Sequence, residues 1–345
     1  MKRWVCICIL ALAWTGCNRE KPAGGRDSTT AADTTGAAAS GGSAKTREIA
    51  VIPKGTTHDF WKSVHAGAVK AQRELGNVNV VFRGPEREDD REQQIALVQN
   101  FVSRQVDAIV LAPLDDRSLA APVRQATQAG IPVVIIDSDL AAEAGKDFVS
   151  FVATDNYQGG VLAAERMAEI LGGKGKVLLL RYQEGSASTV QREKGFTDTL
   201  AKHEGIELVD PKRYAGATRD TAQQASENLL TAYDHVDGIF CPNESSTFGM
   251  LLALRARGLA GKIRFVGFDS SVGLVEALRR DEIDGLVVQN PMRMGYLGVK
   301  SAVDHLDGKP VPPRQDTGVT ILTPENVELP ENRDLIDPDI GQYLK

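Results

Sequence analysis

Short runs of apolar and β-branched residues recur along the chain from Ile49 onward, and the segments between them space their apolar residues differently. Trp61, Val64 and Ala68, for example, recur at intervals of three and four residues, the spacing of one face of a helix. A short continuous apolar run predicts a strand that is buried on both faces. The predicted strands are Ile49–Ile52, Val78–Phe82, Ala108–Leu111, Val133–Ile136, Val149–Val152, Lys176–Leu180, Ile206–Val209, Gly238–Phe240, Arg264–Gly267 and Gly285–Val288.

Strands that alternate with helices predict βαβ units, and therefore parallel sheets with helices on both faces. The part of the chain from Glu48 to Lys345 is long enough to favour two such lobes over one. The predicted fold class is α/β, with two doubly wound, Rossmann-like lobes. Ligands of such sheets bind outside the carboxyl ends of the strands, so polar residues that follow strands are candidates for a binding site.

Two segments of the chain echo one another. Asp107–Asp137 and Asp237–Asp269 each begin with Asp, a small residue and Ile in a strand, continue through a proline-containing turn and a helix, and close with a second strand and Asp. A duplicated lobe explains the echo and predicts that Asp137 and Asp269 follow equivalent strands. The alternative is that βαβ units simply look alike and that the aspartates are helix caps or turn residues.

The N-terminus has the features of a secretory signal. Lys2 and Arg3 precede ten apolar residues, Trp4–Ala13, which are too few for a membrane span of about 20 residues. Cys17 follows Thr15 and Gly16 and resembles the lipidated cysteine of bacterial lipoproteins, although Trp14 stands where leucine is usual. We expect an extracytoplasmic lipoprotein held at a membrane by Cys17; an ordinary signal peptide is the alternative.

Composition narrows the classes of function further. Residues 18–45 are rich in Ser, Thr, Gly and Ala and predict a flexible tether. The net charge of -6 argues against nucleic acid as the main partner. Once Cys6 and Cys8 leave with the signal and Cys17 carries lipid, only Cys241 remains, so no disulfide is expected. No Cys/His cluster has zinc spacing, and no metal site is expected.

The motifs of common enzymes are missing. The glycine-rich segment 172–176 lacks the spacing of a phosphate-binding loop, and the first βα turn, PKGTTHDFW, has no dinucleotide fingerprint. There is no G-x-S-x-G elbow. The charged run EREDDRE, residues 86–92, is interpreted as a solvated loop and helix start. We therefore expect neither catalysis nor a cofactor.

Polar side chains follow six of the predicted strands, where they would meet at one crevice. A small polar ligand needs such a set of placed donors and acceptors together with flat apolar faces, which Phe60 and Trp61 would supply. Each polar residue by itself has an alternative role as a cap, a turn residue or half of a salt bridge. The polar residues are Lys54, His58, Asp137, Arg192, Asn243, Asp269 and Gln289.

Several segments in a fixed order carry a family resemblance: IAVIPKGTTHDFWKSVHAGAVKAQRELG, VDAIVLAPLDD, AGIPVVIIDSD, TDNYQGG, QREKGF, ENLLTAYDHVDGIFCPNE and VGFDSS. They resemble the bacterial periplasmic sugar-binding proteins of the ribose-binding type, the solute receptors of ABC importers. The resemblance covers roughly residues 48 to 323. It implies a type I periplasmic binding protein fold with a three-segment hinge.

In that family a polar residue and an aromatic pair after the first strand contact the sugar, which implies His58, Phe60 and Trp61. The aspartate after PVVII implies Asp137, and the next residue, Ser138, is counted with it as an implied ligand contact, although ribose binders have arginine there. The other ligand contacts implied by the matching motifs are Arg192, Asn243, Asp269 and Gln289.

The chain also departs from the ribose-binding pattern, so the resemblance does not name the sugar. The family has asparagine where His58 stands, and small residues around Ala217 replace an expected aromatic, for which Tyr214 is the nearest substitute. The start IAVIPK, the DSD at 137–139 and Pro242 also resemble the autoinducer-2-binding receptor of the same fold. There the lysine after IP touches the ligand, which implies Lys54.

The resemblance implies chain crossings between the lobes near Thr154, Asn290 and Gly318. The implied organisation is a signal peptide (1–16), a lipidated cysteine with a flexible linker (17–47), an N-lobe (48–154 and 290–317) and a C-lobe (155–289 and 318–345).

The function implied is an extracytoplasmic, periplasmic receptor that binds a small sugar or polyol between the lobes and delivers it to the permease of an ABC importer. We expect a monomer. The main alternative is a sensory receptor for a sugar or an autoinducer-2-like ligand that signals to a membrane kinase or chemoreceptor. A hydrolase using Asp137 and Asp269 would lack a nucleophile or metal set, and a repressor would need a helix-turn-helix before Glu48.

Overall fold

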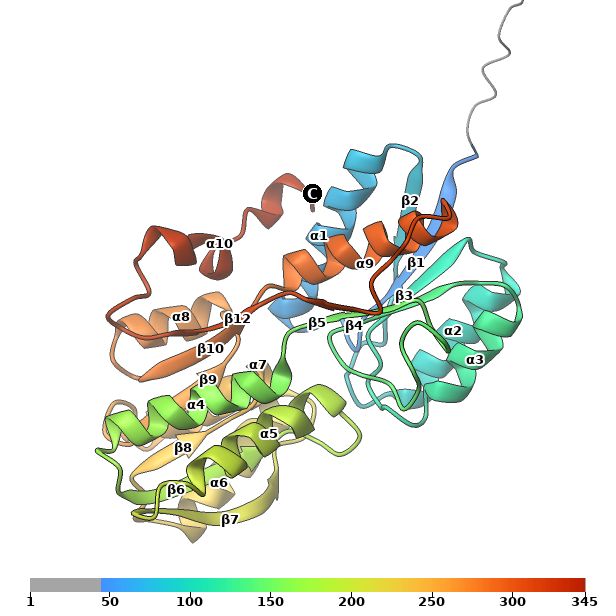
Figure 1. The fold of residues 1–345 in the computed structure, drawn as a ribbon. Coiled ribbons are helices and arrows are strands. Elements are labelled where there is room, and N and C mark those ends of the chain that lie inside the picture. Colours follow the sequence, from blue (N-terminus) through green and yellow to red (C-terminus); the bar gives the residue numbers. More distant parts are fainter. Residues whose placement is uncertain (1–44, 345) are drawn as a thin grey trace, which may run out of the picture. The chain divides into compact units, whose positions relative to one another are not determined.

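Two six-stranded sheets, each with helices on both faces, make up the part of the chain that the computed structural model describes, residues 45–344 (Figure 1). The predicted α/β class with two doubly wound lobes is confirmed. The predicted signal peptide, the candidate lipidation site Cys17 and most of the predicted linker lie outside the described residues. Strand β1 already begins at Arg47, whose guanidinium lies 2.6 Å from the carboxylate of Asp307.

The first sheet is parallel throughout. Its strands, in spatial order, are β11 (Arg314–Asp316), β5 (Ser150–Ala153), β4 (Val133–Ile136), β3 (Ala108–Leu111), β1 (Arg47–Ile52) and β2 (Val78–Phe82). Its helices are α1 (Asp59–Leu75), α2 (Arg91–Ser103), α3 (Ala120–Gln128) and α9 (Pro291–Leu306).

The period of two along a strand divides the apolar residues of the first sheet between two cores. Ile49 and Val51 of β1 pack under α1 and α9, whereas Ala50 and Ile52 pack under α2 and α3. All four residues are fully buried, which explains why the strand is apolar without alternation.

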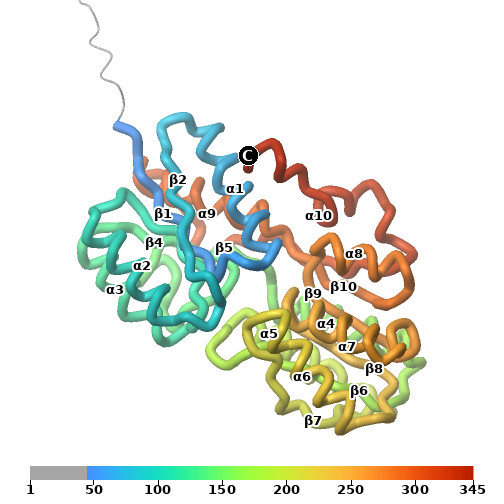
Figure 2. The backbone as a smooth tube through the Cα atoms, turned by 180° about the vertical axis from the view of Figure 1, so that it is seen from behind, coloured from blue at the N-terminus to red at the C-terminus, as the bar shows by residue number. Residues whose placement is uncertain are grey.

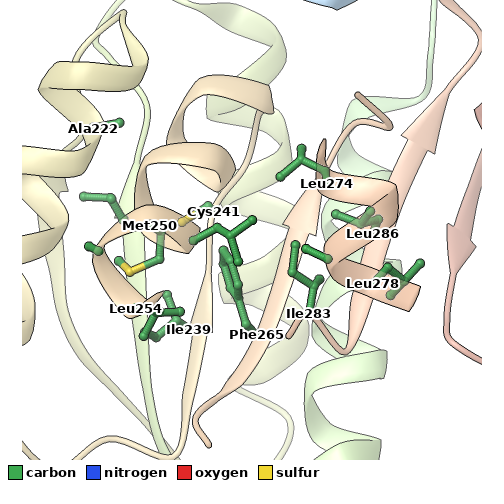
Figure 3. Close-up of a cluster of buried hydrophobic side chains, with 14 of the residues drawn as sticks. Ala222, Ile239, Cys241, Met250, Leu254, Phe265, Leu274, Leu278, Ile283 and Leu286 are labelled. Carbon is green, nitrogen blue, oxygen red and sulfur yellow. The ribbon is translucent and has the colours of Figure 1, made fainter. Parts of the chain in front are cut away.

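The second sheet has the same strand order, but its edge strand β12 runs antiparallel to β10. Its strands, in spatial order, are β12 (Val319–Leu322), β10 (Gly285–Gln289), β9 (Arg264–Phe268), β8 (Gly238–Phe240), β6 (Gly175–Arg181) and β7 (Ile206–Tyr214). Its helices are α4 (Asn156–Ile170), α5 (Ala187–Leu200), α6 (Arg219–Ala232), α7 (Glu244–Ala256) and α8 (Val272–Arg279). Figure 3 shows the core beneath α7 and α8, where Met250 and Leu274 meet Phe265 of the sheet.

All ten predicted strands are present, although β7 runs on to Tyr214 instead of ending at Val209. Strands β11 and β12 were not predicted. Both lie at the edge of a sheet, and β11 consists of the polar residues Arg314, Gln315 and Asp316. An edge strand of this kind lacks the buried apolar run on which the sequence prediction relied.

The chain passes between the sheets in three connections, β5 to α4, β10 to α9 and β11 to β12, and Thr154, Asn290 and Gly318 lie in them. The tail then forms η1 (Pro330–Asn332), α10 (Arg333–Ile336) and η2 (Ile340–Gln342). The end of the tail lies beside α1 (Figure 2), where the Arg73 guanidinium donates to the carbonyl oxygen of Gln342 at 2.6 Å.

Pairs of glycines let neighbouring helices cross closely in both lobes. A Cβ added at Gly67 of α1 or at Gly295 of α9 would lie 1.9 Å from a carbonyl oxygen of the facing helix. The equivalent distances at Gly160 of α4 and Gly195 of α5 are 2.0 and 2.1 Å. Because α1 and α5 carry candidate site residues, these crossings also hold the site in place.

We predict that Gly67→Ala destabilises the protein, because the new methyl group would meet the Met292 carbonyl at 1.9 Å and force the helices apart. Overpacking of this kind costs about 1–3 kcal/mol or more. Thermal and urea unfolding would measure it. The control is Gly341→Ala, where the added methyl would lie 3.9 Å from Asp339, an ordinary contact. Equal stability of the two variants would contradict the prediction.

Candidate ligand-binding site

Polar side chains from both lobes line one pocket at the carboxyl ends of the strands. Nine of the ten residues predicted as ligand contacts line it: Lys54, His58, Phe60, Trp61, Asp137, Arg192, Asn243, Asp269 and Gln289. It is also lined by five residues that were not predicted: Glu88, Tyr182, Ser188, Thr189 and Glu244.

Two other residues considered in the sequence analysis, Ser138 and Tyr214, do not line this pocket. Ser138 does not line the pocket; it is fully buried, and its hydroxyl accepts a hydrogen bond from the backbone N–H of Ser188 at 3.1 Å. Tyr214, the substitute for a missing aromatic, lies on edge strand β7 and is 37% exposed, with the Arg181 guanidinium over its ring. Tyr214 therefore does not line the pocket.

The two aspartates of the internal echo occupy equivalent places. Asp137 follows β4 and Asp269 follows β9, and these strands hold the same position in their sheets. Both residues have left-handed backbones, with φ of 62° and 73°. Aspartate tolerates this conformation better than most residues do. The backbone N–H of each donates to the neighbouring strand, Asp137 to Val152 and Asp269 to Val287. The predicted equivalence is confirmed.

Lys54 joins the two lobes on the Asp137 side of the pocket. Its ammonium lies 2.7 Å from Asp137 Oδ2 and donates to the hydroxyl of Ser188 in the other lobe at 2.9 Å. The Lys54 side chain is only 4% exposed, so its charge needs these partners.

Glu88 corrects the interpretation of the charged run 86–92 as solvated. Its side chain is 6% exposed, and one oxygen lies 2.5 Å from His58 Nδ1. The Trp61 indole N–H donates to the same carboxylate at 2.7 Å, and the Tyr182 hydroxyl of the other lobe does so at 2.8 Å. The run does contain a helix start, because Asp90 caps α2.

The His58–Glu88 contact is an ion pair. Burial alone would lower the pKa of His58, but the charge of Glu88 outweighs burial and raises the pKa to about 9. Burial alone would raise the pKa of Glu88, but His58 outweighs it and lowers the pKa to about 2. Both groups are therefore charged at neutral pH, and His58 is a double donor.

The adjacent aromatics have different surroundings. Trp61 is 3% exposed and packs in the core beneath α1, with its indole N–H committed to Glu88. Phe60 is half-buried and meets Trp61 edge to face, with ring centroids 4.9 Å apart. Both rings line the pocket, so Trp61 combines a structural role with a place in the site.

Arg192 enters from α5 and is held rigidly. Its Nε donates to Asn156 Oδ1 at 2.8 Å, and Nη1 donates to the Pro242 carbonyl at 2.9 Å. The guanidinium lies 3.9 Å from the ring centroid of Phe268, a cation–π contact. Burial lowers the pKa of Arg192, although nearby Asp269 and Asp137 favour its charge.

Asn243, Asp269 and Gln289 complete the side contributed by the second lobe. Asn243 is the N-cap of α7, and its side-chain oxygen accepts from the Ser246 amide, so it serves a structural role as well. Gln289 Nε2 donates to Asp269 at 2.7 Å. Burial raises the pKa of Asp269 to about 6, against the opposing charge of Arg192.

Two buried acceptors in the pocket accept no hydrogen bond from any residue between 45 and 344. They are Asp137 Oδ2, on the first lobe, and Gln289 Oε1, on the second. Asp137 Oδ2 nevertheless lies 2.7 Å from the Lys54 ammonium and is held in an ion pair, whereas Gln289 Oε1 has no such partner. A buried acceptor without a donor costs about 1–3 kcal/mol. A ligand hydroxyl would relieve Gln289 Oε1, and a second hydroxyl would share Asp137 with Lys54.

Two other features, a metal-binding cluster and a membrane-spanning helix, are not found in the described part of the chain. No group of three or more His, Cys, Asp or Glu side chains there is arranged to hold a metal ion. No helix within residues 45–344 combines the length and the apolar character needed to cross a bilayer.

The family of the chain follows from comparison with known proteins. Residues 49–310 match the family model of the periplasmic binding protein domain. The chain belongs to this family. The two doubly wound lobes, the connections between them and the shared pocket fit that assignment.

Relatives of the chain include sugar receptors. The D-allose-binding periplasmic protein of Escherichia coli is 30% identical over 271 residues, covering 77% of this chain and 86% of the relative. The D-ribose/D-allose-binding protein of Pseudomonas aeruginosa is 27% identical, covering 82% and 89%. An ABC transporter solute binding protein from Agrobacterium vitis, solved with bound D-fucose, is 37% identical with a TM-score of 0.81, covering 84% and 99%.

We predict that Glu88→Gln lowers the free energy of unfolding by roughly 3 kcal/mol near pH 6, because it leaves a buried histidine without its counter-charge. The His58 pKa lies above its ordinary 6.5, so the pair's stabilisation is complete below pH 6.5 and is lost as pH rises through about 9. The Glu88 pKa lies below its ordinary 4.5, so stabilisation is also lost as pH falls from 4.5 toward about 2. The difference between wild type and variant is therefore largest between these limits.

Urea unfolding of both proteins across about pH 5 to 10 measures this difference. The control is Glu92→Gln, an exposed carboxylate of the same charged run. A difference between wild type and Glu88→Gln that does not change from neutral to alkaline pH would rule out the ion pair.

Proposed function

We propose that the chain is an extracytoplasmic solute receptor that binds a small sugar between its lobes and delivers it to the permease of an ABC importer. The observation that carries the proposal is the pair of buried acceptors, Asp137 Oδ2 and Gln289 Oε1, one from each lobe. Sugar hydroxyls are donors of the required kind, and a ring bonded to both would connect the lobes. The sugar-binding relatives support the same interpretation.

The charges around the pocket support an uncharged ligand. Opposite charges already balance: the cations Lys54, His58, Arg192 and Arg219 face the carboxylates Glu88, Asp137, Glu244 and Asp269. A charged ligand would add an ion that no neighbouring charge is left to neutralise. A neutral ligand rich in hydroxyls can instead exchange hydrogen bonds with groups that stay paired.

The proposed mechanism is closure of the N-lobe (48–154 and 290–317) on the C-lobe (155–289 and 318–345) about the three connections. To shift the ratio of closed to open protein from 1:99 to 99:1, the ligand must bind the closed state about 5.5 kcal/mol more tightly than the open state. Hydrogen bonds to charged groups contribute about 1.5–3 kcal/mol each, so a few bonds made only in the closed state suffice. The closed form is the one that docks on the permease.

A sensory receptor would use the same site, and co-purification with a permease or with a membrane kinase separates the two functions.

We predict that a screen of pentoses, hexoses and polyols, including D-ribose, D-allose and D-fucose, finds a sugar that raises the melting temperature by a few degrees. Autoinducer-2 belongs in the same screen because Lys54 lines the pocket. Asp137→Ala and Gln289→Met each remove one buried acceptor and should weaken binding of that sugar by roughly 10- to 150-fold.

Isothermal titration measures the loss, and circular dichroism checks that both variants fold. Asp234→Ala, whose side chain is 83% exposed on the C-lobe, is the control and should bind like wild type. Normal binding by both site variants would place the ligand elsewhere. Turnover of the bound sugar would contradict a role as a receptor only.

We also propose that Cys17 carries lipid and that residues 18–45 tether the folded body to a membrane. The positively charged start, the short apolar run and the cysteine support this proposal. Lipid on one residue together with a flexible tether leaves the body able to reach a permease in the same membrane.

Cys17→Ala is expected to move the protein from the membrane fraction to the soluble fraction and to abolish metabolic labelling with palmitate. Sugar binding by the purified variant should be unchanged, because Cys17 lies outside the described lobes. The control is Cys241→Ala, a buried cysteine of the C-lobe that should leave fractionation and labelling unaltered. A labelled Cys17→Ala protein would exclude this lipidation site.

A further inference from the structure

Helix α1 begins at the pocket without a side-chain cap of its own. Its N-cap residue is His58, whose side chain makes no hydrogen bond to the helix and is instead paired with Glu88. The first backbone N–H groups of a helix have no partner within the helix and need one elsewhere. In α1 these groups belong to Asp59 and Phe60, and Phe60 is itself a candidate ligand contact.

The missing cap comes from the opposite lobe. The carboxylate of Glu244, the first residue of α7, accepts hydrogen bonds from the backbone N–H of Phe60 at 3.1 Å and of Asp59 at 3.4 Å. Glu244 is 2% exposed. A carboxylate at this position also interacts favourably with the partial positive charge of the helix N-terminus. Glu244 therefore caps α1 across the boundary between the lobes.

Arg219 keeps this arrangement electrically balanced. Its guanidinium donates to Glu244 Oε1 and lies 3.6 Å from the carboxylate of Asp59. It also stacks on the ring of Phe248, 4.3 Å from the centroid. Asp59 and Glu244 would otherwise repel one another at the lobe boundary. Because Arg219 belongs to the same lobe as Glu244, Glu244 keeps a counter-charge even when the lobes separate.

The backbone of Glu244 connects the cap to the pocket. Its N–H donates to Asp269 Oδ2 at 2.8 Å, and the other oxygen of Asp269 accepts from Gln289. One residue thus contacts the acidic group of the second lobe through its main chain and the start of α1 through its side chain. A change at Asp269 on binding and the position of α1 are therefore mechanically coupled.

We propose that Glu244 is a positioning residue that caps α1 of the opposite lobe when the lobes close, and that this cap holds His58 and Phe60 in their binding positions. The inference rests on the proposed function, because it requires lobes that separate to admit a sugar. When the lobes open, water replaces Glu244 as the hydrogen-bond acceptor of the Asp59 and Phe60 amides. On closing, the cap adds stability that only the closed state has, and so it slows release of the ligand.

Hydrogen exchange at the amides of Asp59 and Phe60, followed by NMR, tests the cap directly. Glu244→Gln keeps the shape of the side chain but removes its charge, and Glu244→Ala removes both acceptors. In the protein saturated with the sugar found by the thermal screen, we expect exchange at these two amides to be about three- to tenfold faster in Glu244→Gln, and faster still in Glu244→Ala. The control is Glu276→Gln, a 52% exposed carboxylate of α8 in the same lobe, which should exchange like wild type.

The second readout is the kinetics of the sugar that gives the largest shift in the thermal screen. Glu244→Gln should raise the dissociation rate constant more than it lowers the association rate constant, a split that general destabilisation would not produce. Unchanged exchange at Asp59 and Phe60 in both variants would overturn the cap. Faster exchange with unchanged dissociation would overturn its role in binding. If no sugar in the screen binds, the proposed function fails, and the cap, which rests on it, fails with it. If a sugar binds but does not slow exchange at these two amides in the wild type, the cap alone fails.

Discussion

The buried carboxylate of Glu88 is the interaction on which the arrangement of the site depends. An isolated carboxylate in this position would cost several kcal/mol of desolvation, so it requires partners. It has three, and each one orients a part of the pocket: His58 from the first lobe, the indole of Trp61, and the hydroxyl of Tyr182 from the second lobe. Without Glu88, His58 would lose the largest contribution that raises its pKa, and the indole N–H of Trp61 would lose its acceptor in the core. The loop after β2 thereby determines the chemistry of the loop after β1.

The shared strand order of the two lobes explains why such a pocket lies between them. Both sheets have the same strand order, and each places an aspartate in a left-handed conformation after its fourth strand in sequence. The copies have nevertheless diverged in what the aspartates contact. Asp137 faces an ammonium from its own lobe, whereas Asp269 accepts from a backbone N–H and an amide and has a pKa raised by burial. Asp137 is therefore held by a direct ion pair, whereas Asp269 is held mainly by neutral donors, with the charge of Arg192 nearby.

Much of this structure could be predicted from the sequence, because buried strands and helix faces have local periods. The ten predicted strands follow from apolar runs, and the place of Asp137 and Asp269 follows from an echo between two such units. What could not be predicted depends on contacts between distant segments. Glu88 lies in a run of charges that looks solvated in the sequence, and only its contacts with His58 and Tyr182, 30 and 94 residues away, bury it. Ser138 and Tyr214 lie outside the pocket lining for the same reason, since neighbouring strands and side chains decide where a strand-end residue points.

The pattern of satisfied and unsatisfied groups then limits what the pocket can recognise. Most of its polar atoms already have protein partners: Arg192 bonds Asn156 and Pro242, Asn243 caps α7, and Asp269 holds Gln289. Such groups fix the shape of the site but discriminate weakly, because a ligand that fails to reach them leaves no new unpaired atom. We expect selectivity to depend instead on Asp137 Oδ2, which has only the Lys54 ammonium beside it, on Gln289 Oε1, which has no donor, and on the pocket side of the charged His58 ring. Under the proposed function, a ligand without a hydroxyl opposite Gln289 Oε1 leaves that oxygen buried without a donor, which costs about 1–3 kcal/mol. We therefore expect the two oxygens, which lie on opposite lobes, to determine much of the preferred stereochemistry of the ligand.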